Sequence, residues 1–141
     1  MTLPRRLRLA ILISGRGSNM EALLRATADP DYPAEPVLVL SNRPDARGLD
    51  TARAAGVEAT AIDHKSFGKD REAFERAMDA RLREAGVELI ALAGFMRVLT
   101  PWFVSRWPGR LLNIHPSLLP KYRGLDTHQR AIDAGDLTAG C

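Results

Sequence analysis

The stretch that decides the fold is Leu7-Arg-Leu-Ala-Ile-Leu-Ile13, followed directly by Ser14-Gly-Arg-Gly-Ser-Asn19. Residues 7–13 are almost all apolar, which predicts a strand buried on both faces of a sheet. The glycines that follow predict a sharp turn, and residues Asn19–Ala28 predict a helix. A buried strand, a glycine turn and a helix open a β–α–β unit, so we expect the neighbouring strands to be parallel.

The same alternation continues along the chain. Further strands are expected at Pro36–Leu40, Val57–Ile62, Val87–Ala93 and Arg110–Ile114. Further helices are expected at Asp45–Ala55, at Asp70–Ala85 and at Thr127–Ala134. A short helix is also expected to begin at Pro101, with Thr100 as its N-cap. This order predicts an α/β fold with a doubly wound, mostly parallel sheet. We treat residues 1–141 as one domain. We expect it to be truncated at its C-terminus, because Gly135–Cys141 resembles a turn and the start of another strand.

The composition excludes several classes of protein. The 141 residues are 45% hydrophobic and 26% charged, as in ordinary globular domains. The net charge of +3 comes from basic residues interleaved with acidic ones, as at Glu75-Arg76, which we interpret as solvent-facing helix surface. No basic block is present to follow a nucleic acid backbone. The apolar runs are too short to span a bilayer. We therefore expect a cytoplasmic protein that binds small molecules, without nucleic acid or membrane partners.

A metal site is not expected either. Cys141 is the only cysteine, which excludes an intrachain disulfide and a cysteine-based zinc site. His64 is expected in a loop and His128 at a helix start, and neither has a carboxylate at a metal-ligand spacing.

Ligands of parallel sheets bind beyond the carboxyl ends of the strands, here Ser14–Asn19, Gly94–Leu99 and His115–Leu125. The first segment can present free N–H groups at a helix N-terminus to a phosphate. It matches neither the dinucleotide fingerprint nor the Walker pattern, which favours a mononucleotide-like or sugar phosphate. The alternative is a plain glycine turn with Ser18 as helix N-cap.

The second segment, Gly94-Phe-Met-Arg-Val-Leu99, combines apolar side chains with one cation. Such a loop suits a flat, partly apolar ligand with an acidic tail. Taken alone, the pattern favours the simpler interpretation that Phe95, Met96, Val98 and Leu99 pack in the core.

The third segment follows Asn113, which is separated from His115 by one residue at a strand end. Their side chains should therefore project from the same face. Together they offer a neutral donor for a developing oxyanion and an acid–base that titrates near neutral pH. No Ser or Cys nucleophile accompanies them, which favours direct transfer between two bound substrates. The alternative is a buried structural histidine beside an asparagine turn.

Three motifs, in this order and spacing, resemble the phosphoribosylglycinamide formyltransferases, a folate-dependent family of purine biosynthesis. They are Ile-Ser-Gly-Arg-Gly-Ser-Asn, Leu-Ala-Gly-Phe-Met-Arg-Val-Leu and Leu-Asn-Ile-His-Pro-Ser-Leu-Leu-Pro-Lys-Tyr-Arg-Gly. The likeness runs from Leu7 to Cys141 and covers the N-terminal part of the family's length. It implies a Rossmann-like formyltransferase fold, and direct transfer of a formyl group from 10-formyltetrahydrofolate to the amine of 5-phosphoribosylglycinamide. It implies no metal.

The resemblance also implies roles for single residues. Gly17, Ser18 and Asn19 would hold the substrate phosphate. The folate would contact Arg71, Met96, Arg97, Val98, Leu99 and Asn113. Asn113 would hold the formyl oxygen, and His115 would be the catalytic acid–base. Arg71 has no signal of its own and looks like an ordinary helix-face charge. An aspartate that tunes the catalytic histidine in the family has no counterpart here.

Two other functions stay open. The chain could be a truncated, non-catalytic relative that binds a sugar phosphate. It could also be another formyltetrahydrofolate-using enzyme, such as methionyl-tRNA formyltransferase or formyltetrahydrofolate deformylase, although the extra domains of those enzymes are not seen. The sequence does not predict the oligomeric state.

Overall fold

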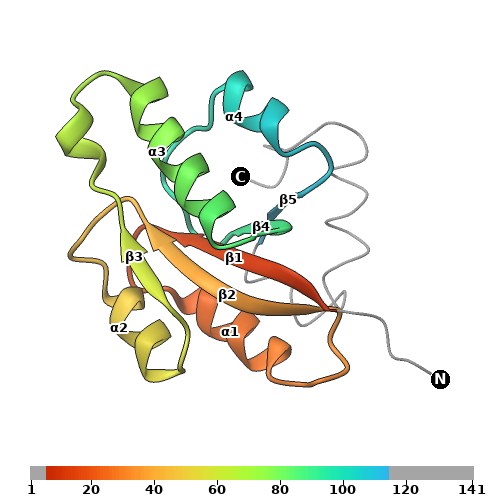
Figure 1. The fold of residues 1–141 in the computed structure, drawn as a ribbon. Coiled ribbons are helices and arrows are strands. Elements are labelled where there is room, and N and C mark those ends of the chain that lie inside the picture. Colours follow the sequence, from red (N-terminus) through yellow and green to blue (C-terminus); the bar gives the residue numbers. More distant parts are fainter. Residues whose placement is uncertain (1–5, 115–141) are drawn as a thin grey trace.

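The computed structural model of the chain describes residues 6–114, which form a five-stranded sheet in the order β3-β2-β1-β4-β5 with all neighbours parallel (Figure 1). The strands are β1 (Leu7–Ile13), β2 (Ala34–Ser41), β3 (Ala59–Ala61), β4 (Leu89–Leu92) and β5 (Leu111–Asn113). The helices are α1 (Ser18–Thr27), α2 (Arg47–Ala54), α3 (Arg71–Glu84) and α4 (Pro101–Arg106), with a short 3₁₀ helix, η1, at His64–Phe67. The predicted doubly wound α/β fold is confirmed.

Each face of the sheet carries its own core, because side chains alternate along the strands. Leu9, Ile11 and Ile13 of β1 pack with Met20 of α1 and Leu49 of α2. The intervening Ala10 and Leu12 pack on the opposite face with residues of α3 and α4, namely Phe74, Met78, Phe103 and Trp107. Figure 1 shows α1 and α2 below the sheet and α3 and α4 above it. β1 is therefore buried on both faces, as its apolar run predicts.

Two strands begin later than the sequence predicts, for the same reason. β3 starts at Ala59 and β4 at Leu89, each two residues after the predicted start. The Val57 N–H donates to the Ala52 carbonyl, and the Val87 N–H donates to the Leu82 carbonyl. In each case a glycine with positive φ lies directly before the valine, and this arrangement is typical of a helix C-terminus. The two valines therefore end helices rather than open strands.

Other predictions hold with small shifts. Thr100 caps α4, accepting a hydrogen bond from the Phe103 N–H, and Pro101 is the first helical residue, as predicted. η1 was not predicted; its N-cap, Asp63, accepts a hydrogen bond from the Lys65 N–H. The predicted helix Thr127–Ala134 lies outside the described residues.

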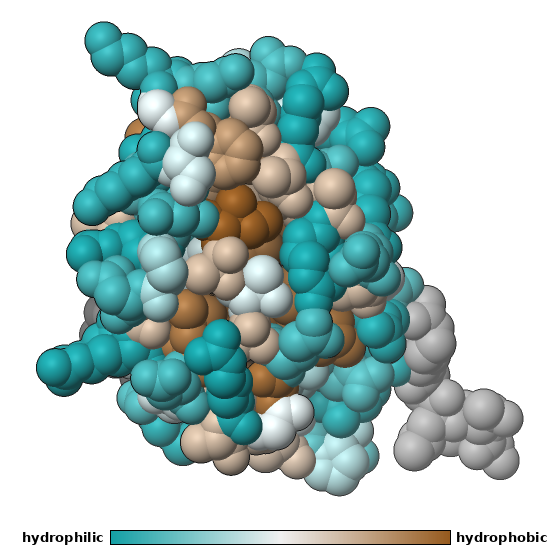
Figure 2. Space-filling view, turned by 60° about the vertical axis from the view of Figure 1, so that its left-hand side comes forward, coloured by the Kyte–Doolittle hydropathy of each residue, from teal (hydrophilic) through white to brown (hydrophobic). Residues whose placement is uncertain are grey.

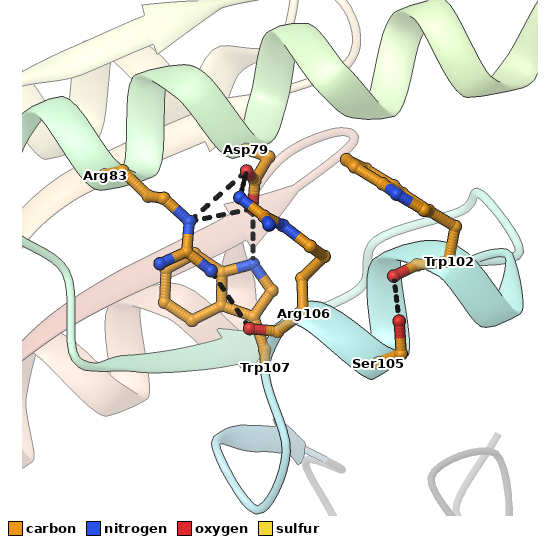
Figure 3. A network of polar contacts seen from close by, with 6 residues as sticks. All are labelled: Asp79, Arg83, Trp102, Ser105, Arg106 and Trp107. Atoms are coloured by element: carbon orange, nitrogen blue, oxygen red, sulfur yellow. Dashed lines mark hydrogen bonds and ion pairs between the residues drawn. The ribbon is translucent and has the colours of Figure 1, made fainter.

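Two buried carboxylates fasten α3 to α4 and the chain just before it. Asp79, 5% exposed, accepts a hydrogen bond from Trp107 Nε1 at 2.9 Å and pairs with Arg106 at 2.9 Å and Arg83 at 3.3 Å (Figure 3). Glu75, 1% exposed, accepts hydrogen bonds from the Thr100 N–H, at 2.7 Å, and from the Thr100 hydroxyl. The interpretation of Glu75 as solvent-facing helix surface is therefore wrong.

β3 forms one edge of the sheet. Figure 2 brings this edge forward and shows apolar residues gathered down the middle of the face, between polar and charged ones. Partly buried Val57, Ala59 and Ala61 pack on one core, and Ile62 and Phe67 on the other. A three-residue edge strand offers little backbone for pairing with another chain. Within residues 6–114, no helix has the length and apolar character needed to cross a membrane.

Candidate active site

The site lies where the sheet changes winding direction. The chain runs outward from β1 through β2 to β3, then returns to place β4 on the other side of β1. Beyond the carboxyl ends of β1 and β4, the loops 14–17 and 93–99 therefore flank the topological switch point. This is where ligands bind in doubly wound sheets. Two of the three segments singled out in the sequence come together here.

The loop after β1 ends in a backbone geometry that favours glycine. Gly17 is the N-cap of α1, with φ +81°. The first intrahelical bond runs from the Glu21 N–H to the Gly17 carbonyl, so the N–H groups of residues 18–20 precede the helical ladder. The alternative of Ser18 as N-cap is wrong, since Ser18 is already helical and Gly17 makes no side-chain cap. The geometry suits an anion at the helix N-terminus.

A second glycine, Gly48, supports this loop from α2. The Gly48 N–H donates to the Gly15 carbonyl at 3.0 Å. A Cβ at Gly48 would lie 2.5 Å from Ile13 Cδ1, and one at Gly17 would lie 3.2 Å from Gly48 Cα. Sequence reasoning missed Gly48, although a glycine within the first turn of a helix is a signal, because it costs helix stability. The two glycines let the loop and the start of α2 approach closely.

Asn19 links the start of α1 to the end of β5. Its Nδ2 donates to the Ile114 carbonyl at 3.4 Å, at the long end of the hydrogen-bond range. Its Oδ1 is buried without a hydrogen-bond partner among the described residues. Such a buried acceptor is costly unless something donates to it. Asn19 thus joins the predicted phosphate loop to the strand that carries Asn113.

In the loop after β4, residues 93–99, some apolar side chains pack on the core and others are exposed. Phe95 and Leu99 are partly buried against the core beneath α3 and α4. Met96 is 79% exposed and Val98 is 69% exposed, although both are large apolar side chains. The interpretation that all four pack in the core is therefore wrong for Met96 and Val98. An exposed apolar pair beside Arg97 suits a partly apolar ligand.

Arg97 contacts an aromatic ring of α3, the helix that begins with Arg71. Arg97 lies over Phe74, with its guanidinium carbon 5.9 Å from the ring centroid. Arg71 is the exposed first residue of α3, and Phe74 follows it by three positions in the same helix. The contact with Phe74 therefore places Arg97 against the helix that begins with Arg71, 26 positions earlier in the sequence.

Asn113 is the last residue of β5, is partly buried and pairs in register with Leu92 of β4. Leu112 and Ile114, its neighbours in the chain, belong to the core on the α1 and α2 side, so Asn113 faces the α3 and α4 side. His115 lies outside the described residues, and its pairing with Asn113 stays a prediction.

Two polar residues at the site, Asn42 and His64, carried no clear sequence signal, whereas Ser14 belongs to the predicted segment Ser14–Asn19. Ser14 and Asn42 are buried and bonded to each other, and His64 contacts Asn42. Because the contacts bridge 28 and 22 positions, no local pattern predicts them. Across residues 6–114, no cluster of three His, Cys, Asp or Glu side chains could hold a metal ion. Burial raises the pKa of Tyr32, which lies just before the amino end of β2, at the opposite end of the strands from the site.

Comparisons with known proteins agree with this geometry. The family model described as formyl transferase matches residues 7–141. The chain is 46% identical over 138 residues to the trifunctional purine biosynthetic protein adenosine-3 of Bos taurus, covering 98% of this chain and 14% of that protein. It is 46% identical over 129 residues to the phosphoribosylglycinamide formyltransferase of Haemophilus influenzae, covering 92% of this chain and 60% of that one.

A solved structure supports the same assignment. The crystal structure of phosphoribosylglycinamide formyltransferase from Brucella melitensis superposes with a TM-score of 0.76 at 50% identity, covering 93% of this chain and 68% of that chain. The chain thus spans about three-fifths of the length of the single-function relative from Haemophilus influenzae. Since the family model covers nearly every residue and the fold agrees, the chain belongs to the formyl transferase family.

Proposed function

We propose that the protein to which this chain belongs transfers a formyl group from 10-formyltetrahydrofolate to the amine of 5-phosphoribosylglycinamide. One observation carries the proposal. At the switch point between β1 and β4, a glycine loop on a helix N-terminus stands beside a loop with a cation and exposed apolar side chains. The first suits a sugar phosphate, and the second suits a flat ligand with an acidic tail. The names of the relatives support formyl transfer to phosphoribosylglycinamide.

The proposed binding roles follow this division. Gly17, Ser18 and Asn19 bind the phosphate through N–H groups that precede the helical ladder. The folate lies against Met96 and Val98, whose apolar side chains it would remove from water.

Two cations take the acidic end of the folate. Arg97, which lies over Phe74, and Arg71, at the start of the helix that carries this ring, meet the carboxylates of the folate. Leu99 supports the loop from the core, against which it packs.

The proposed chemistry is a direct transfer. The amine nitrogen attacks the formyl carbon, a C–N bond forms, and the carbonyl electron pair moves to oxygen. Asn113 donates a hydrogen bond to this oxyanion, which in general removes several kcal/mol, about 3, from a barrier. His115 takes the proton from the attacking nitrogen. Collapse of the tetrahedral carbon then breaks its bond to N10 of the folate, which receives a proton. No covalent enzyme intermediate is required.

The test is a formyl-transfer assay on the full-length protein, with products identified by mass spectrometry. We expect formylated phosphoribosylglycinamide and tetrahydrofolate in equal amounts. Asn113→Ala should lower kcat by about a hundredfold, the usual cost of losing an oxyanion donor. Formate released without the amine would instead indicate a deformylase. Sugar-phosphate binding without turnover would indicate a non-catalytic relative.

A further inference from the structure

The loop 94–99 is held at the switch point by a hydrogen-bonded chain from β1 and β2. The Met96 N–H donates to Ser14 Oγ at 2.7 Å. The Ser14 hydroxyl donates to Asn42 Oδ1 at 2.5 Å. Ser14 and Asn42 are both buried, so water does not compete strongly for these bonds. The exposed side chain of Met96 cannot anchor the loop, and its backbone does so instead.

The series of hydrogen bonds continues from Asn42 to His64. Because Oδ1 of Asn42 accepts from Ser14, its Nδ2 is directed at His64 Nδ1, 3.1 Å away. The same Nδ1 lies 3.0 Å from the Asn42 carbonyl oxygen. With its hydrogen on Nε2 the ring accepts from the amide, and with a hydrogen on Nδ1 it donates to the carbonyl. His64 is therefore bound to Asn42 in either state.

His64 is also connected to the loop 94–99 through a second set of contacts, between side chains. Its ring meets Phe74 edge to face, with centroids 6.4 Å apart and an interplanar angle of 78°. Phe74 in turn carries Arg97 over its ring. Met96 and Arg97 are consecutive, so the contacts form a closed circuit that fixes both the backbone and the cation of the loop.

We propose that Asn42 and His64 are positioning residues for the folate-binding loop. They touch no reacting atom. They hold the Met96 amide through Ser14, and they orient the ring on which Arg97 lies. This inference rests on the proposed function for its effect on activity, whereas its effect on the loop's conformation does not.

The test compares two substitutions of His64 in the full-length protein. His64→Leu removes the polar atom. His64→Asn keeps a polar atom at the same position along the side chain as Nδ1. For His64→Leu we expect the KM for 10-formyltetrahydrofolate to rise about threefold to tenfold, the effect of one net hydrogen bond. The KM for 5-phosphoribosylglycinamide should change less than about twofold, and His64→Asn should restore most of the difference.

A second readout is hydrogen–deuterium exchange of peptides that cover residues 94–99. His64→Leu should accelerate their exchange, and His64→Asn should restore it. The matched control is Asp63→Ala, which removes the N-cap bond of η1 to the Lys65 N–H but leaves the contact between His64 and Asn42. It should change neither the KM for folate nor the exchange of the loop.

Each result decides the inference. Unchanged exchange in His64→Leu would overturn it, as would equal effects of Asp63→Ala or an equal rise of both KM values. If the wild-type protein transfers no formyl group, the proposed function fails. The exchange of the loop would still show whether His64 positions it.

Discussion

Replacement of Gly17 by alanine tests the phosphate loop, and the chain supplies its own control. Gly17 and Gly56 both have φ +81°. An alanine in this region costs about 1–2 kcal/mol of backbone strain at either position. A Cβ at Gly56 meets no atom within 4 Å, whereas one at Gly17 lies 3.0 Å from Met20 Cε and 3.2 Å from Gly48 Cα. The Met20 methyl can shift, but the Gly48 backbone is held by Gly15.

The two variants should differ in function far more than in stability. Relief of the strain at Gly17 rotates the peptide that leads into α1 and turns the N–H groups of Ser18 and Asn19 away from the phosphate. A hydrogen bond to a charged group contributes about 1.5–3 kcal/mol. Loss of one such bond should therefore raise the KM for 5-phosphoribosylglycinamide about tenfold to a hundredfold. Gly56, at the end of α2, has no such role.

The assay combines thermal unfolding with steady-state kinetics for both substrates. We expect Gly17→Ala and Gly56→Ala to lower the melting temperature by comparable amounts, with a somewhat larger loss at Gly17. Only Gly17→Ala should raise the KM for the sugar phosphate, and the KM for the formyl donor should stay within about twofold. If Gly17→Ala destabilises the protein without changing that KM, the phosphate does not bind at the start of α1.

Three further substitutions test the supports of the site. Glu75→Gln should cost about 1 kcal/mol in urea unfolding, because a neutral amide replaces the charged acceptor of two hydrogen bonds from Thr100. Asp79→Ala should cost about 3 kcal/mol in the same measurement, since it leaves Trp107 Nε1 without an acceptor and breaks two ion pairs. Arg97→Ala should raise the KM for 10-formyltetrahydrofolate about tenfold with little change in melting temperature, because it removes one cation–π contact while Phe74 stays packed in the core.

The architecture could be predicted from the sequence because each strand can be recognised from its own run of apolar residues. Leu7–Ile13 is apolar at six of seven positions, and its predicted bounds agree with β1. The errors at β3 and β4 have a local cause. Val57 and Val87 are apolar and β-branched, so they look like the first residues of strands. Their N–H groups instead bond to carbonyls of the preceding helices and end those helices. The pattern of side chains alone does not show whether such a residue ends a helix or begins a strand.

The supports of the site could not be predicted in this way. Glu75 and Asp79 lie on a helix rich in alternating charge, where a carboxylate looks solvated whichever way it faces. Their burial depends on Thr100 and Trp107, which are 25 and 28 positions away. His64 has no neighbour at a recognisable spacing, and its partner Asn42 comes from another strand end. Such pairs can be identified only once the order of the strands in the sheet is known.

The exposure of Met96 and Val98 explains why hydrogen bonds help to support the loop after β4. Met96 and Val98 must stay accessible if they are to contact a ligand, so they cannot contribute the burial that normally fixes a loop. The conformation is fixed by the packing of Phe95 and Leu99 together with two hydrogen bonds, one from the Met96 N–H to Ser14 and one from the Thr100 N–H to Glu75. A loop held this way loses less conformational entropy when a ligand binds, so more of the contact energy remains as affinity. Buried polar groups thus keep an apolar surface both exposed and ordered.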